Sequence, residues 1–410
     1  MAIVTPALAL LPSVSAAEER APGPPEHMST VGGELLGEVG TQVDRARGAP
    51  ELPEDLTAKS WIVADAESGE VFAAHNAHWP LPPASTLKML FADTVLPRLD
   101  PEDVYRARPE DFTELGEGSS SVGVADGQTY TVEDLWHGAL LASGNDAVYA
   151  LAAMNGGLER TVEQMNERAR ELQALDTHAV NPDGYDAEGQ TSSAYDLTLI
   201  ARDAMQNAAF REYVALPRAD FPGAGSGEDR ETYEIQNTNR LLVGADGLEP
   251  YEGIAGVKNG YTSQAGHTFT GIAERDGRVL LVTVLAPDEE KGPLAVYREA
   301  AALLDWGFEA AGHARPIGEL VPPRDQETAA GAGRQEESAR ERGGERAASS
   351  ADSERPVSGY LVLAVTAAGL AVLALAAYLF HRRHPLPSPA ALRSALPRRR
   401  GRPHEDADPD

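Results

Sequence analysis

The stretch Pro83-Ala84-Ser85-Thr86-Leu87-Lys88-Met89 decides how the rest of the chain is interpreted. Proline is well placed just before or at a helix start, so the sequence predicts a helix from Ser85 toward Leu96. Ser85 and Lys88 are three positions apart, which places their side chains on one face of that helix. A serine is a poor nucleophile unless a neighbour takes its proton, and a lysine can do so when burial and nearby positive charge lower its pKa. This stretch therefore predicts a nucleophile beside its base, and Lys258 could be the second positive charge.

Two further motifs follow in order along the chain, Ser143-Gly144-Asn145 and Lys258-Asn259-Gly260. The first follows an apolar segment and predicts a tight turn, from which Ser143 could relay a proton and Asn145 could hydrogen-bond a substrate amide. The second lies in a glycine-rich strand, where a peptide could add as a further strand with its terminal carboxylate near Lys258. Each of these two motifs, taken alone, could equally be an ordinary turn or a surface strand. Together the three indicate acyl transfer through a serine ester, next to a free carboxyl group.

Composition excludes several other classes of function. The 410 residues include no cysteine and carry a net charge of -29. Disulfides and cysteine-based metal sites are therefore excluded, and a nucleic-acid surface, which needs a basic face, is not expected. Only four lysines are present, and two of them, Lys88 and Lys258, fall inside the motifs. His75 and His78 are close in sequence but have no carboxylates beside them, so neither a metal site nor a cofactor is expected.

Strand and helix patterns indicate one α/β domain over residues 56–312. Residues 60–66 and 71–74 predict a β-hairpin, and Asp276-Gly277 predicts a second hairpin between strands at 267–273 and 278–286. Helical periodicity covers residues 131–154, 158–175, 192–207 and 293–308. Strands at both ends with helices between them predict a sheet built from distant parts of the chain, with a helical insertion.

The flanking segments differ sharply in composition. Residues 1–17 resemble the end of a signal peptide, whereas 18–55 and 313–356 are expected to be a disordered leader and a disordered linker. Residues 357–380 carry no charge over 24 positions, which is enough for a helix at about 1.5 Å per residue to cross a hydrocarbon core of about 30 Å. The arginine-rich tail at 381–410 is then expected in the cytoplasm, with the catalytic domain outside the membrane.

The ordered motifs resemble those of the D-alanyl-D-alanine carboxypeptidases among the low-molecular-mass penicillin-binding proteins, peptidase family S11. Residues 126–135, 181–185 and 192–197 also resemble the segments that accompany those motifs in the family. The resemblance covers about residues 56–312 and implies an α/β fold of the serine β-lactamase and DD-peptidase type, with an antiparallel sheet formed from both chain ends plus a helical subdomain. It also implies a bacterial cell-membrane protein that acts on peptidoglycan stem peptides ending in D-Ala-D-Ala and is inhibited covalently by β-lactams.

The resemblance assigns roles to particular residues. Ser85 would attack the terminal D-Ala–D-Ala bond, Lys88 would be its base, and Ser143 and Asn145 would act on the leaving group and the substrate amide. The backbone N–H groups of Ser85 and Tyr261 would form the oxyanion hole. The residues expected to bind substrate are Asn145, Lys258, Asn259, Gly260, Tyr261 and Thr262.

One position departs from the family pattern, because Asn259 replaces the usual threonine of the third motif. An amide can donate a similar hydrogen bond to a carboxylate through its NH₂ group, and Thr262 lies close by. A β-lactamase is disfavoured, because residues 181–186 contain no glutamate to activate a deacylating water. An endopeptidase or transpeptidase on the same fold stays open. So does a catalytically weak, wall-binding membrane anchor, which the Asn259 departure supports.

Overall fold

The computed structural model describes residues 23–45, 48–225 and 230–326. No helix within these ranges is long and apolar enough to cross a membrane. The predicted signal remnant (1–17), transmembrane helix (357–380) and basic tail (381–410) lie outside the described residues.

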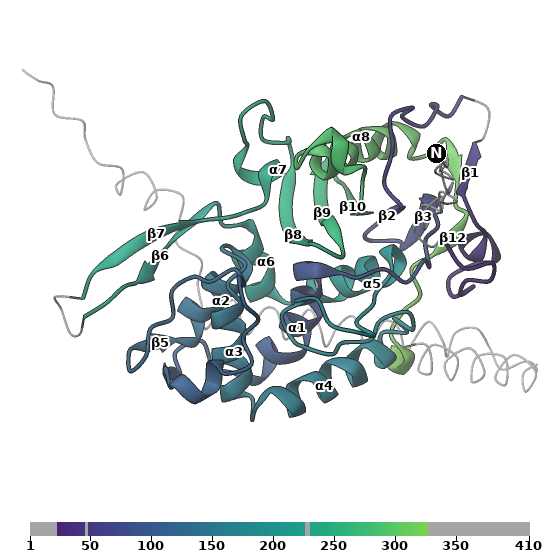
Figure 1. Ribbon diagram of the computed structural model, residues 1–410. Coiled ribbons are helices and arrows are strands. Elements are labelled where there is room, and N and C mark those ends of the chain that lie inside the picture. Colours follow the sequence, from purple (N-terminus) through teal and green to yellow (C-terminus); the bar gives the residue numbers. More distant parts are fainter. Residues whose placement is uncertain (1–22, 46–47, 226–229, 327–410) are drawn as a thin grey trace, which may run out of the picture. The chain divides into compact units, whose positions relative to one another are not determined.

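A central antiparallel sheet organises the domain (Figure 1). Its strands lie in the order β11 (Ala314–Arg315), β1 (Thr41–Arg45), β3 (Glu70–His75), β2 (Ser60–Asp65), β10 (Arg278–Leu285), β9 (Gly266–Arg275) and β8 (Ile254–Thr262), and β12 (Gly318–Glu319) also pairs with β3. Both predicted hairpins are confirmed, as β2–β3 and as β9–β10. At the second, Asp276 and Gly277 have φ angles of 53° and 75°, the left-handed backbone that a tight Asp-Gly hairpin turn requires. Strand β8 ends the sheet, and among the described residues no further strand pairs with its outer edge.

Helices cover both faces of this sheet, with α8 on one face and α5 on the other (Figure 1). The α-helices are α1 (Lys88–Val95), α2 (Val132–Leu140), α3 (Asn145–Met154), α4 (Leu158–Glu171), α5 (Ala194–Ala204), α6 (Ala208–Ala215), α7 (Arg240–Val243) and α8 (Ala295–Ala310). Short 3₁₀ turns are η1 (Glu34–Gly37), η2 (Ala84–Leu87), η3 (Leu96–Arg98), η4 (Pro109–Phe112) and η6 (Glu289–Lys291). Two small hairpins, β4 (Val104–Arg106) with β5 (Thr129–Thr131) and β6 (Arg218–Pro222) with β7 (Thr232–Gln236), lie outside the main sheet.

Helix starts follow local signals in the sequence. Thr131 accepts a hydrogen bond from the backbone of Asp134, whose carboxylate accepts one from the Thr131 N–H, so a complete capping box begins α2. Ser193 caps α5 with a single hydrogen bond, which its hydroxyl accepts from the N–H of Asp196. These caps define the first turns of two helices in the helical subdomain. This subdomain also carries the second motif, at the junction of α2 and α3.

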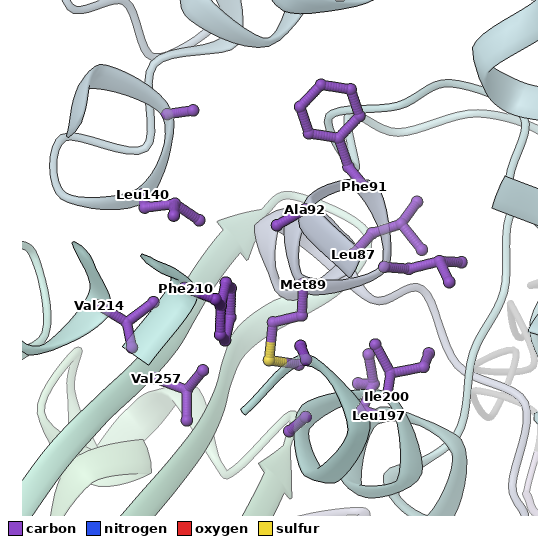
Figure 2. Packing of buried hydrophobic residues seen from close by; sticks show 14 of the residues in the cluster. Leu87, Met89, Phe91, Ala92, Leu140, Leu197, Ile200, Phe210, Val214 and Val257 are labelled. Carbon is purple, nitrogen blue, oxygen red and sulfur yellow. The ribbon is translucent and has the colours of Figure 1, made fainter. Parts of the chain in front are cut away.

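The helical subdomain is held to the sheet by one large apolar core. Met89 of α1 extends toward Phe210 of α6, beside Leu197 of α5 and Val257 of β8 (Figure 2). All of these side chains are buried. Burying a side chain of this size contributes about 1.5–3 kcal/mol. Because α1 follows directly after the Ser85 turn, this packing fixes the turn against both the sheet and the helices.

Two predicted boundaries are wrong. Residues 18–55 are not wholly a disordered leader, because η1 and β1 lie in this segment and Leu36 is buried. Likewise the linker does not begin at 313, since β11 and β12 follow, and Leu320 is buried. The composition of these segments resembles that of a linker. A few buried apolar side chains are nevertheless enough to order such a segment when its backbone pairs with an existing sheet. The domain therefore extends over residues 23–326 rather than 56–312.

Candidate active site

The first motif forms a 3₁₀ turn rather than the start of an α-helix. Ser85 lies in η2, and α1 begins at Lys88. Side chains at positions i and i+3 eclipse one another in 3₁₀ geometry, and Lys88 Nζ lies 2.8 Å from Ser85 Oγ. Ala84 precedes the nucleophile with a φ of 49°, and such a left-handed non-glycine residue costs about 1–3 kcal/mol. The surrounding packing therefore holds Ser85 in a strained turn beside Lys88.

Lys88 is fully buried and donates to three oxygen acceptors. Besides Ser85 Oγ, its Nζ contacts Asn145 Oδ1 at 2.6 Å and the backbone carbonyl of Asp183 at 2.7 Å. Burial lowers the pKa of Lys88 to about 8, while the negative charges of Asp183 and Asp146 oppose this shift. A lysine with such a pKa is partly neutral near physiological pH, and only the neutral amine can accept the serine proton.

The second motif joins α2 to α3, and its turn is held by a buried carboxylate. Ser143 has a φ of 60°, and α3 begins at Asn145, the residue that contacts Lys88. Asp146 accepts hydrogen bonds at 2.8–3.0 Å from four backbone N–H groups, those of Val122, Gly123, Val124 and Ala147. Within the described residues, no hydrogen bond joins Ser143 Oγ to Ser85, Lys88 or Lys258.

The third motif places a second buried lysine on β8. Lys258 donates from Nζ to the backbone carbonyl of Asn259 at 2.7 Å. Burial lowers the pKa of Lys258 well below its usual value, and the positive charge of Lys88 lowers it further. The sequence predicts the reverse influence, of Lys258 on Lys88, but burial is the cause of the lowered pKa of Lys88. The two ammonium groups lie close enough to disfavour double protonation.

Strand β8 passes directly over the nucleophile. A Cβ atom at Gly260 would lie 2.6 Å from Ser85 N, so only glycine permits this approach. Tyr261 is 58% exposed, and Thr262 Oγ1 accepts from Ala265 N at 3.1 Å. A cavity of about 240 Å³ opens beside Ser85 and is also lined by Asn145, Tyr261 and Thr262. A larger cavity of about 740 Å³ lies away from the motifs, next to residues 321–326.

Several residues of this site were not singled out in the sequence. Gly184 has a φ of 85°, and a Cβ there would lie 1.9 Å from Ala84 O. Asp183 Oδ1 accepts from Tyr185 N, whereas Oδ2 is buried without a partner among the described residues. Thr238 Oγ1 lies 2.8 Å from Asn259 Oδ1. Only the segment 181–185 carried any signal, through its resemblance to the family.

His78 lies beside carboxylates, although none stands beside it in the sequence. It is buried, with Nδ1 2.6 Å from Asp176 Oδ2 and Nε2 3.0 Å from Val31 O, and Asp196 lies nearby. The carboxylates absent from the neighbouring sequence thus come from distant segments. Because both ring nitrogens are already hydrogen-bonded, and Ser193 also donates to Asp176, we interpret this cluster as a structural connection between the N-terminal segment and the helical subdomain.

Comparison with known proteins agrees with the geometry. The family profile of D-alanyl-D-alanine carboxypeptidase (peptidase S11) matches residues 46–288. The carboxypeptidase DacB2 of Mycobacterium tuberculosis is 39% identical over 264 residues, which cover 64% of this chain and 85% of the relative. DacD of Escherichia coli is 32% identical over 271 residues, covering 63% of this chain and 65% of the relative.

Solved structures give the same result for the fold. A D-alanyl-D-alanine carboxypeptidase from Mycobacterium tuberculosis H37Rv has a TM-score of 0.59 at 39% identity, covering 67% of this chain and 99% of the other. The Streptomyces K15 DD-transpeptidase has a TM-score of 0.58 at 26% identity, covering 63% and 99%. The expected β-lactamase and DD-peptidase type of fold, with its antiparallel sheet, is confirmed. This chain belongs to the D-alanyl-D-alanine carboxypeptidase family, peptidase S11.

Proposed function

We propose that this protein is a serine-type D-Ala-D-Ala carboxypeptidase that removes the terminal D-alanine from peptidoglycan stem peptides through an acyl-enzyme on Ser85. The observation that carries the proposal is the contact between Ser85 Oγ and the fully buried Lys88 Nζ at 2.8 Å. Burial lowers the pKa of Lys88 to about 8, so part of the amine is neutral near physiological pH. Lys88 can therefore serve as the base that a serine nucleophile needs.

The reaction follows from these positions. Neutral Lys88 takes the Ser85 proton, and Oγ attacks the carbonyl carbon of the penultimate D-alanine. The N–H groups of Ser85 and Tyr261 stabilise the oxyanion, each contributing about 3 kcal/mol. The C–N bond then breaks as the proton held by Lys88 is relayed through Ser143 to the departing D-alanine nitrogen. A water gives a proton to the again neutral Lys88 and attacks the ester carbonyl, and Ser85 Oγ leaves and recovers that proton.

Substrate binding uses the outer edge of β8, where no strand pairs within the part of the chain that the structure describes. A peptide running beside Gly260, Tyr261 and Thr262 would place its terminal carboxylate near Lys258 and Asn259, while Asn145 would hydrogen-bond its amide. β-Lactams present a carboxylate and a reactive carbonyl in similar positions, and we expect them to acylate Ser85.

We also propose attachment to the bacterial cell membrane by residues 357–380, with the catalytic domain outside and the tail at 381–410 in the cytoplasm. The uncharged run of 24 residues and the arginines that follow it support this arrangement. A cysteine-accessibility experiment would test it, because a cysteine introduced near position 405 should react with a membrane-impermeant maleimide only after lysis.

Transfer to an amine acceptor is the second candidate activity. It is favoured by the similarity to the Streptomyces K15 DD-transpeptidase, since both outcomes pass through the same acyl-enzyme. Adding glycine or D-amino acids to the assay would separate them, because transfer produces a new peptide whereas hydrolysis produces only the shortened one.

The deciding experiment is D-alanine release from a pentapeptide ending in D-Ala-D-Ala by the full-length chain. Ser85→Ala should abolish release. Lys88→Arg is the matched control for the base, because arginine keeps the charge but cannot accept a proton, so it should also be inactive. Release that persists in Ser85→Ala, or no release by the wild type, would refute the carboxypeptidase assignment.

A further inference from the structure

We propose that Thr238 is a positioning residue that orients the side-chain amide of Asn259, with its NH₂ group facing the carboxylate of the substrate. This inference rests on the proposed function, because it concerns how the third motif binds a C-terminal carboxylate. It identifies the group that takes the place of the threonine hydroxyl usual at that position of the family pattern.

The contacts of Thr238 determine where its hydroxyl proton goes. Thr238 Oγ1 lies 2.8 Å from Asn259 Oδ1 and 3.1 Å from Leu141 O. A hydroxyl has a single proton to donate. Leu141 O already accepts from the backbone N–H of Thr238 at 3.0 Å. That carbonyl therefore does not depend on the hydroxyl for a partner, and we assign the hydroxyl proton to the shorter contact, with Asn259 Oδ1.

The segment around Thr238 is held firmly enough for this role. The flanking residues Asn237 and Asn239 are both buried. Asn237 Nδ2 donates to Leu216 O at 3.0 Å, and Asn237 Oδ1 accepts from Asn239 N at 2.9 Å. The carbonyl of Thr238 itself accepts from the hydroxyl of Tyr297 at 3.2 Å. Thr238 is thereby fixed from both sides, as a group that orients another must be.

The orientation of the amide decides whether the site attracts or repels a carboxylate. With Oδ1 engaged by Thr238, the two N–H donors of Asn259 point elsewhere, and within the described part of the chain no acceptor for Nδ2 is present. Hydrogen bonds from such donors to a carboxylate are stronger than those between neutral groups. A flipped amide would instead present a carbonyl oxygen to the substrate carboxylate, beside Lys258. Thr238 selects the first arrangement.

The test compares Thr238→Val, which replaces the hydroxyl with a methyl group of similar size, with Thr238→Ser, which keeps the hydroxyl. Two peptides are used, one ending in D-alanine and one ending in D-alanine carboxamide. We expect KM for the carboxylate peptide to rise about tenfold in Thr238→Val, with kcat retained because ground-state binding is lost. Thr238→Ser should restore KM. KM for the carboxamide peptide should differ far less between the variants, because this peptide has no terminal carboxylate for Asn259 to bind.

A double-mutant cycle separates positioning from a general structural effect. In an Asn259→Ala background, Thr238→Val should have no further effect on KM, because Thr238 acts only through the amide. Asn259→Asp should raise KM more than Asn259→Ala, since the oxygen facing the cleft would repel the substrate. Any of three results would overturn the proposal. Thr238→Val could have a wild-type KM, it could raise KM equally for both peptides, or it could raise KM as much in the Asn259→Ala background as in the wild type.

Failure of the proposed function gives a different result. If the wild type releases no D-alanine, the carboxypeptidase assignment fails, but acylation of Ser85 by a fluorescent penicillin still reports on carboxylate binding. Acylation should then be slower in Thr238→Val and normal in Thr238→Ser. Equal acylation rates in both variants would contradict the role of Thr238, and thermal melting of each variant identifies any loss of folding.

Discussion

Gly184→Ala tests whether the loop at 181–185 holds the nucleophile in place. Gly184 has a φ of 85°, and an added Cβ would lie 1.9 Å from Ala84 O. The left-handed backbone costs a non-glycine residue about 1 kcal/mol, and the overlap forces a backbone shift worth about 1–3 kcal/mol more. We expect a loss of about 2–4 kcal/mol in the free energy of unfolding. The shift would displace the strained turn at Ala84 and Ser85, so kcat/KM should fall at least 100-fold, as for a misplacement of about 1 Å.

Gly189→Ala is the matched control from the same loop region. Gly189 has a φ of 81° but no atom within 4 Å of the added Cβ, so only the backbone cost of about 1 kcal/mol applies. Urea unfolding gives the stability of both variants, and D-alanine release gives kcat/KM. Equal losses of stability, or a Gly184→Ala variant with wild-type activity, would show that contact between this loop and Ala84 does not position Ser85.

Three further predictions concern charged groups. kcat/KM should increase with pH through the Lys88 pKa of about 8, because the base must be neutral. Asp183→Asn removes an anion that favours the ammonium form, so it should move this increase to lower pH. An unchanged pH profile in Asp183→Asn would contradict the assignment of Lys88 as the base. Asp146→Ala leaves four backbone donors without their acceptor, so urea unfolding should show a loss of about 3 kcal/mol, whereas a loss below about 1 kcal/mol would mean that the loop is held otherwise. Arg168→Met removes the ion-pair partner of Asp93 at 2.6 Å, whose side chain is 7% exposed, and should cost about 3 kcal/mol in the same assay. Arg168 also pairs with Glu171 and Asp203, so the part of the loss that Asp93→Asn recovers in the double variant would be assigned to the unpaired Asp93 carboxyl group.

Local signals predicted the contacts made within one turn or one hairpin. Ser85 and Lys88 are three positions apart, so backbone geometry alone brings their side chains together. The contact between Lys88 and Asp183 spans 95 positions, and the contact between Thr238 and Asn259 spans 21. Neither follows from periodicity, because each depends on how the helical subdomain packs against the sheet. The family resemblance supplied the motifs but gave no reason to examine Thr238.

The sequence alone also does not give the size of the effect that burial has on the pKa of Lys88. The sequence predicts that a second lysine helps to lower the pKa of Lys88, yet burial alone lowers this pKa, against the opposing effect of two carboxylates. The degree of burial depends on residues from α3, β8 and the loop at 181–185 together. Sequence patterns identify which groups can titrate, whereas the packing of distant segments determines how far their pKa values move.

The corrected domain boundaries lead to a final prediction about truncation. A protein of residues 50–315 contains all three motifs but lacks β1 and β12, which both pair with β3. It also loses Leu36 and Leu320, whose side chains are 1% and 2% exposed. Burial of each contributes about 1.5–3 kcal/mol, so the two side chains and the lost pairing amount to about 5 kcal/mol.

That loss approaches the whole stability of an ordinary domain, about 5–15 kcal/mol. Thermal unfolding should therefore show a melting temperature for residues 50–315 at least 10 °C below that of residues 23–326, by the usual conversion for a large domain. The site itself contains no atom from the removed segments, so any folded fraction should keep its KM for the pentapeptide. Equal melting temperatures would mean that the terminal strands are dispensable. A raised KM with unchanged stability would instead mean that these segments support the site through contacts other than those described above.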